Sequence, residues 1–169
     1  MGIDGVIKEL ERNRKVFLEI FRDLPSDFIT WKANPKDWSA LEIICHLIDE
    51  EVDDFRARVR HALENPEAPL VPIDPPGWAI SRNYKGQDFK ASVERWGQER
   101  QKSIEWLSGL SHPKWENTVE HPDLGPITAE SFLYNWLAHD YLHIRQLNRM
   151  RRAYLQESSR DSLTYAGKW

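Results

Sequence analysis

Apolar residues recur every three or four positions along four long stretches of the chain, a spacing that places them on one face of an α-helix. The stretches cover about residues 3–24, 40–64, 87–109 and 129–156, and all ten prolines lie outside them. Because proline breaks a helix interior, the prolines mark the connections. The pattern predicts an all-α fold, a four-helix bundle, as a single domain over residues 1–169.

The connections carry their own signals. Ser39 followed by Glu42 predicts a capping box at the start of the second helix, and Thr128 is placed to cap the fourth. The segment from residue 64 to 86 holds five prolines and is long enough to cross to the far end of the bundle, which would let helices 2 and 3 run parallel. A short extended piece is expected within residues 115–124.

Two histidines on the fourth stretch are the strongest candidates for chemistry. His139 and His143 are four residues apart, so they stack one turn apart on the apolar face of their helix. Two imidazoles at that spacing can bind one metal ion, although such a pair can also be an ordinary, partly buried pair. The residue after His139 is Asp140, so the pair lacks the glutamate of a His-Glu-x-x-His peptidase motif.

A catalytic zinc site needs a third protein ligand, and His46 is the best candidate. On a helical wheel His46 falls beside acidic residues, away from the main apolar stripe of the second helix. Its neighbours in sequence are apolar, so this turn is expected to be buried all round. His46 and His143 meet only if the fourth helix extends roughly two turns beyond the second.

Composition and charge narrow the function classes. The formal net charge of −4 argues against nucleic acid as the main partner, and no apolar run approaches the roughly 20 residues of a membrane span. A single cysteine, Cys45, excludes an internal disulfide and fits a cytoplasmic protein. Four arginines, at 145, 149, 151 and 152, are interpreted as cations favoured at a helix C-terminus rather than as an anion site.

Two segments together resemble the DinB-like (DinB/YfiT) metalloenzyme family. Residues 38–47 (WSALEIICHL) are similar to the opening of that family's second helix, and residues 139–147 (HDYLHIRQL) to its helix-4 histidine motif. The resemblance covers nearly the whole chain. It implies a bundle of up-down-down-up topology, a zinc or nickel ion held by His46, His139 and His143, and a homodimer.

The resemblance also implies a range of activities, among them thiol-dependent S-transferases that use low-molecular-weight thiols. A metal-dependent transfer of such a thiol to a small-molecule substrate is therefore the first hypothesis, and hydrolysis by metal-bound water is its rival. A non-catalytic metal-binding, stress-response or interaction module is the third.

Beyond the ligands, the sequence indicates only candidates, and no catalytic residue is assigned. Asp49, Glu50 and Gln146 are candidates for proton acceptors or for partners of the metal ligands. Trp78, Trp136 and Tyr141 are candidates for the pocket wall.

Overall fold

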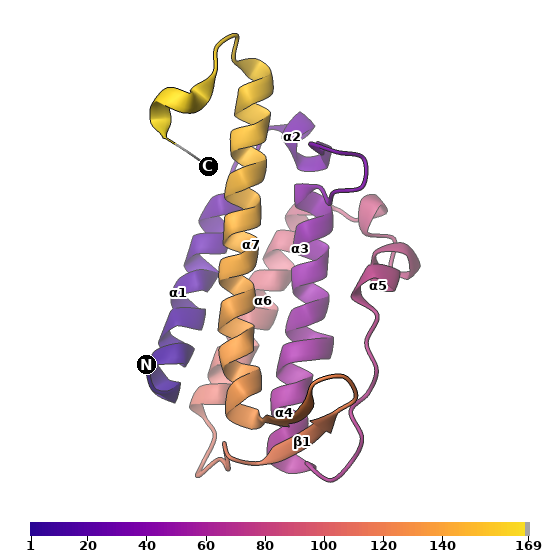
Figure 1. The fold of residues 1–169 in the computed structure, drawn as a ribbon, viewed down its shortest axis with the longest axis vertical. Coiled ribbons are helices and arrows are strands. Elements are labelled where there is room, and N and C mark those ends of the chain that lie inside the picture. The colour runs from indigo at the N-terminus through magenta and orange to yellow at the C-terminus, as the bar shows by residue number, and fades with distance from the viewer. Residues whose placement is uncertain (168–169) are drawn as a thin grey trace.

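Four helical rods packed side by side form the body of the molecule in the computed structural model, which describes residues 1–167 (Figure 1). The rods are α1 (Ile3–Phe21), α3 (Ala40–Asp49) with its continuation, α6 (Phe89–Ser108) and α7 (Ala129–Ser158). The second rod continues from α3 through the π-helical segment η1 (Glu50–Phe55) into α4 (Arg56–Glu64). The helical bundle predicted from the apolar spacing is confirmed.

Several short elements join the rods. They are α2 (Ser26–Thr30), α5 (Pro75–Ser81), the 3-10 turn η2 (Tyr84–Gly86), β1 (Thr118–His121), β2 (Gly125–Thr128) and the 3-10 turn η3 (Leu163–Ala166). The strands β1 and β2 form an antiparallel hairpin in which Thr118 faces Thr128. The hairpin contains the expected extended piece.

One predicted boundary needs correction, and one connection contains a short helix that the sequence did not predict. The first helix ends at Phe21 rather than at residue 24, because the chain turns at Asp23, whose φ is +49°, and restarts as α2. The connection between the second and third rods is not structureless. Asp74 caps α5 by accepting a hydrogen bond from the Gly77 amide, and prolines occupy the first turn, where they cost no hydrogen bond.

The predicted caps are present. The Ser39 hydroxyl accepts from the Glu42 amide, and the Glu42 carboxylate accepts from the Ser39 amide at 2.9 Å. The Thr128 hydroxyl accepts from the Ser131 amide at the start of α7. These bonds satisfy amides that the first turn of a helix leaves without a partner.

Helix α3 is buried along its entire length. All ten of its residues are buried, because α2, α5 and η2 pack on the sides that the other rods leave free. Tyr84 in η2 donates a hydrogen bond to Asp49, and Arg82 forms an ion pair with the same carboxylate at 2.7 Å. The connection thus covers α3 and is held to it by polar contacts.

A polar layer divides the apolar core into two clusters. One cluster includes Phe17, Trp96 and Leu147, and the other includes Leu10, Phe55 and Leu133. Between them, one buried polar side chain from each rod belongs to a single group joined by hydrogen bonds. These are Asn13 of α1, Glu51 of η1, Arg100 of α6 and Asp140 of α7.

Arg100 is the centre of this layer. Its guanidinium donates to both carboxylate oxygens of Asp140, at 2.7 and 2.8 Å, and to Glu51 at 2.8 Å. Asn13 donates to Asp140 at 3.1 Å, and the Trp136 indole donates to Glu51 at 3.0 Å. Burial disfavours the charged guanidinium, but the two carboxylates outweigh burial and raise the pKa of Arg100. The guanidinium is therefore charged although it is buried, whereas burial raises the pKa of its partner Glu51.

No helix within residues 1–167 combines the length and the apolarity that crossing a bilayer requires.

Replacing Asp140 by Asn should lower the free energy of unfolding by about 3 kcal/mol, because it leaves a buried guanidinium with part of its compensating charge. Urea denaturation of the metal-free protein measures the change. The matched control is Glu19→Gln, which removes an exposed ion pair with Arg22 and should change stability by less than about 0.5 kcal/mol. Equal effects of the two substitutions would contradict a structural role for the layer.

Candidate metal centre

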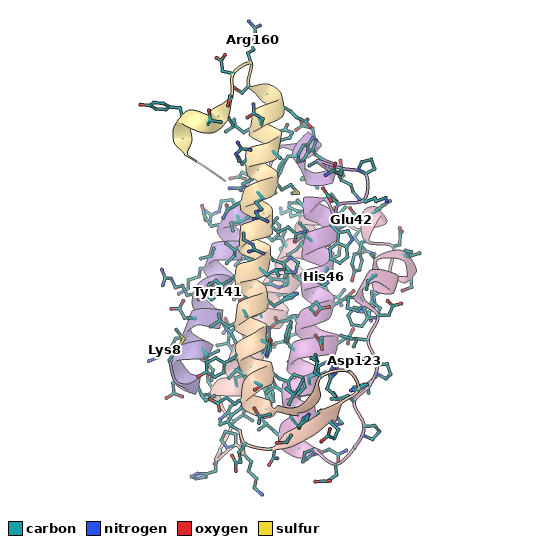
Figure 2. All side chains as sticks on the ribbon, in the orientation of Figure 1. Lys8, Glu42, His46, Asp123, Tyr141 and Arg160 are labelled. Carbon is teal, nitrogen blue, oxygen red and sulfur yellow. The ribbon has the colours of Figure 1, made fainter. Side chains whose placement is uncertain are left out.

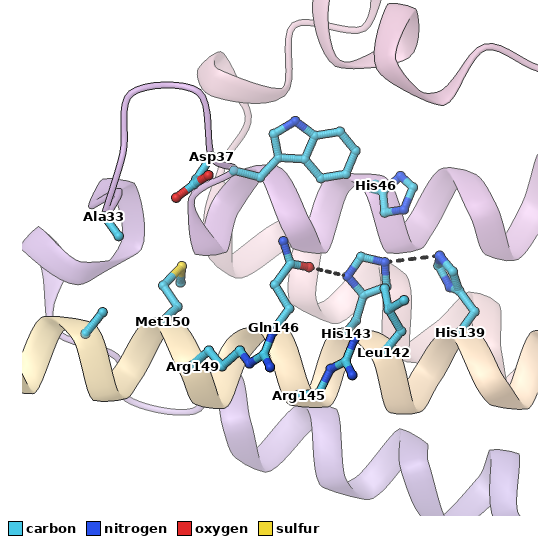
Figure 3. A pocket seen from close by; sticks show the side chains of 12 residues that line it. Ala33, Asp37, His46, His139, Leu142, His143, Arg145, Gln146, Arg149 and Met150 are labelled. Carbon is cyan, nitrogen blue, oxygen red and sulfur yellow. Dashed lines mark hydrogen bonds between the residues drawn. The ribbon is translucent and has the colours of Figure 1, made fainter. Parts of the chain in front are cut away.

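His46, His139 and His143 converge between α3 and α7 (Figures 2 and 3). Each offers a ring nitrogen, and the three nitrogens all lie within 4.8 Å of one another. The Nε2 atoms of His139 and His143 are 3.1 Å apart. Ligand nitrogens at about 2.0–2.1 Å from a tetrahedral zinc ion lie about 3.3 Å from each other, so this spacing fits two ligands of one ion.

The three imidazoles are neutral at physiological pH. Burial, with the nearby His143, lowers the pKa of His46 to about 3. Burial and the two other rings lower the pKa of His139 to about 2. Burial also lowers the pKa of His143, against the opposing effect of Gln146. A neutral imidazole has a free lone pair, which is the form that binds a metal ion.

Gln146 fixes the orientation of one ring. The His143 Nδ1 atom lies 2.7 Å from the Gln146 side-chain oxygen, which can only accept a hydrogen bond (Figure 3). His143 therefore carries its proton on Nδ1 and presents the lone pair of Nε2 toward His139. Of the candidates for partners of the ligands, Gln146 is thus placed against a ligand.

Glu50 lies against the third ring. The His46 Nδ1 atom is 3.7 Å from the nearer Glu50 carboxyl oxygen, and neither atom has a hydrogen-bond partner among the described residues. Burial and the neighbouring Asp54 raise the pKa of Glu50 to about 8. Burial therefore favours the neutral form of the carboxyl group that stands beside His46.

The polar layer holds the histidine pair in place. Asp140, between His139 and His143 in sequence, is completely buried in its contacts with Arg100 and Asn13. Because its side chain is anchored on the side of α7 facing α1 and α6, the rotation of α7 is fixed and the histidines are turned toward α3.

The histidines line a cavity of about 660 Å³. This volume is within the range of small-molecule sites, about 300–1,000 Å³. The Trp38 ring covers His46, with ring centroids 4.6 Å apart. The lining is completed by residues of the 33–38 segment and by one face of α7: Ala33, Asp37, Leu142, Arg145, Gln146, Arg149, Met150 and Ala153.

The remaining candidates from the sequence lie elsewhere. Asp49 contacts Tyr84 and Arg82 of the connection. Trp78 is stacked on the Arg82 guanidinium, and Trp136 is buried in the polar layer. Tyr141 points toward α1, where its hydroxyl donates to Glu9 (Figure 2). None of the four lines the cavity.

Sequence reasoning missed most of the cavity wall, including Trp38, Arg145 and Arg149. For Arg149 a signal was present, because lining positions 139, 142, 146, 149 and 153 continue the three-to-four spacing of the histidine face. For Trp38 the sequence showed only that it precedes the helix cap Ser39, which does not indicate a place in the cavity wall. Cys45, by contrast, is a buried thiol whose pKa is raised to about 11 by burial, which makes it a poor nucleophile.

Replacing Gln146 by Leu should weaken zinc binding by about ten- to a hundredfold, because the His143 ring loses the partner that fixes its tautomer. Competition with a fluorescent zinc chelator measures the affinity. Gln98→Leu, at an exposed position of α6, is the control and should bind as the wild type does. An unchanged affinity of the Gln146 variant would show that the contact does not orient a ligand.

The metal-free protein should lose stability as the pH falls through about 6.5. Below that value the unfolded chain protonates its histidines, whereas His46, with a pKa of about 3, stays neutral in the folded state. Between pH 7.5 and 5.5 each such histidine should lower the free energy of unfolding by about 1.4 kcal/mol.

Urea unfolding of chelator-treated protein at the two pH values tests this expectation. His46→Asn should reduce the loss by about the contribution of one histidine. His112→Asn changes an exposed histidine in a left-handed turn, and this variant should lose as much stability between the two pH values as the wild type does. The same loss in the His46 variant as in the wild type would refute the expectation.

Comparisons with known proteins support the fold and show the family. The fold matches that of YfiT from Bacillus subtilis, described as a probable metal-dependent hydrolase with an unusual four-helix bundle topology. The match has a TM-score of 0.78 at 19% identity and covers 89% of this chain and 86% of YfiT. No curated protein matches the sequence. The sequence profile of the DinB superfamily matches residues 9–147, which confirms the resemblance found in the two motifs, and the chain belongs to the DinB superfamily.

Proposed function

We propose that this protein is a divalent-metal-dependent enzyme that activates a small nucleophile for attack on a small-molecule substrate. One observation carries the proposal: three neutral imidazoles, with nitrogens within 4.8 Å of one another, lie at the wall of a cavity large enough for a substrate. Membership in the DinB superfamily supports it.

The donor set fits zinc or nickel. Imidazole nitrogen suits both ions, and three neutral ligands leave the double positive charge of the ion uncompensated. Among the described residues, the candidate ligand group contains three side chains. Catalytic zinc sites typically have three protein ligands, whereas structural zinc sites have four. A bound ion would supply a Lewis acid that lowers the pKa of a coordinated water or thiol.

The side chains around the three histidines would orient the imidazole rings and exclude water from one side of the centre. Gln146 sets the tautomer of His143, and Glu50 stands against His46. The Trp38 ring, packed on His46, shields one side of the centre from water, which strengthens electrostatic interactions there. Substrate would enter along the face of α7 that lines the cavity.

We take a low-molecular-weight thiol as the first nucleophile to test, and transfer of its sulfur to an electrophilic substrate as the reaction. Hydrolysis by an activated water is the second candidate, and the description of YfiT as a probable metal-dependent hydrolase favours it. A non-catalytic metal-binding module is the third possibility, and a fourth ligand from outside the described group would indicate it.

Three expectations from the sequence belong to the same proposal: a homodimer, a cytoplasmic location and the up-down-down-up order. The path of the chain in Figure 1 supports the last of these, because residues 65–88 return along the outside of the bundle before α6 begins.

The first experiment is zinc and nickel titration of the chelator-treated protein by calorimetry. We expect one ion per chain, and no stoichiometric binding after His46→Ala, His139→Ala or His143→Ala. His112→Asn is the control and should bind one ion. Full metal content in any of the three alanine variants would remove that residue from the proposed site.

Activity is measured next with two substrates, a small thiol with an electrophilic bimane and a nitrophenyl ester. Metal-loaded wild type should turn over one of them faster than metal-free wild type, and His143→Ala should match the metal-free rate. Turnover of the bimane supports thiol transfer, and turnover of the ester supports hydrolysis. Metal binding with no turnover of either in a panel of thiols and esters would favour the non-catalytic module.

A further inference from the structure

Arg145 and Arg149 form a basic side of the cavity. Both are exposed, both line the cavity, and they project from α7 beside Gln146 and His143 (Figure 3). At 1.5 Å of rise per residue, their Cα atoms lie about 3 Å and about 9 Å beyond His143 along the helix axis. A molecule of ordinary metabolite size can therefore reach the metal centre and the arginines together.

Both arginines lie too far from the C-terminal end of α7 to be the helix-terminal cations that the sequence suggested. The helix runs to Ser158, and its last turn contains no basic residue. Arg149 is nine residues before that end, and Arg145 is thirteen. The favourable effect of a helix dipole on a cation is confined to the last turn, so it does not account for either arginine.

The two arginines also lack a compensating charge. Within residues 1–167 neither takes part in a hydrogen bond or an ion pair, whereas Arg151 in the same cluster donates to the Ile20 carbonyl. The only carboxylate that lines the cavity is Asp37, which already accepts a hydrogen bond from Asn34 at 2.9 Å. The lining of the cavity thus contains two guanidinium groups without an ion-pair partner and three neutral imidazoles, two of which share α7 with the arginines.

We propose that Arg145 and Arg149 bind an anionic group, a carboxylate or a phosphate, of the molecule that reacts at the three-histidine centre. The planar guanidinium matches both groups by paired hydrogen bonds, and two of them four residues apart on one helix can hold one anion from two sides. The inference deepens the proposed function and rests on it: the nucleophile or the substrate carries a negatively charged group besides its reacting atom.

The test compares two thiols of similar size, the dianion mercaptosuccinate and the neutral 1-thioglycerol, by calorimetric titration of zinc-loaded protein. We expect mercaptosuccinate to bind at least about tenfold more tightly, since its carboxylates can form charge-assisted hydrogen bonds with the guanidinium groups and the neutral thiol cannot. The double variant Arg145→Gln/Arg149→Gln should lose that preference and keep its bound zinc. Arg145→Lys/Arg149→Lys should recover part of it, because charge is kept while the paired geometry is lost.

Arg12→Gln, at an exposed position on α1, is the matched control and should keep the wild-type preference. Succinate and inorganic phosphate, used separately as competitors of mercaptosuccinate, distinguish a carboxylate from a phosphate site by which of them displaces it at lower concentration. Equal binding of the two thiols by the wild type, or an unchanged preference in the double glutamine variant, would overturn the proposal.

A measurement of zinc content distinguishes failure of the anion site from failure of the proposed function. If the wild type binds no zinc, the proposed function fails by that measurement alone. The anion site is then tested with succinate on the metal-free chain, where the double glutamine variant should again bind about tenfold more weakly than wild type. The same affinity in both proteins would overturn the proposal there as well.

Discussion

A charged guanidinium in the middle of the bundle is the constraint on which the structure depends. Arg100 can be buried only if Asp140 and Glu51 both face it, and these carboxylates come from two other rods. Apolar packing alone tolerates rotation or sliding of helices, whereas paired hydrogen bonds permit one register. Because Asp140 lies between the two histidines of α7, the same interaction that sets the register of the bundle also directs the histidine pair toward α3.

The sequence predicted the long helices well because their signals are local. Apolar spacing and proline positions needed no knowledge of the fold, and the Ser39 cap lies within four residues of its partner. The π-helical segment Glu50–Phe55 was not predicted, because no local sequence preference marks it. What supports it is a contact with another rod, since its wider turn lets Glu51 face Arg100. The short helices α2 and α5 were also missed. With five and seven residues they have too few turns to show a periodicity, and their packing on α3 supports them.

The candidate ligands were predictable for a similar reason, and the wall of the cavity was not. His139 and His143 share a helix face by spacing alone, and His46 came from a helix whose wheel placed it off the main stripe. The structure explains the mismatch: α3 is covered on all sides, so the stripe does not define which residues are buried. Trp38 reaches the cavity only because the 33–38 segment folds over α7, which is a long-range arrangement. Asp49 was expected near the ligands, but its partner Tyr84 lies 35 residues away in the connection.

The π-helical segment has a consequence for how this rod can change. Upstream of Glu50 the helix presents His46 to the cavity, and downstream of Phe55 it presents Val59 and Ala62 to the second apolar cluster. A wider turn between the two halves shifts the angular phase of one against the other. Removing one residue there would restore an ordinary α-helix and turn one half away from its neighbours. The extra residue therefore lets one continuous rod present His46 to the cavity and Val59 and Ala62 to the apolar core at the same time.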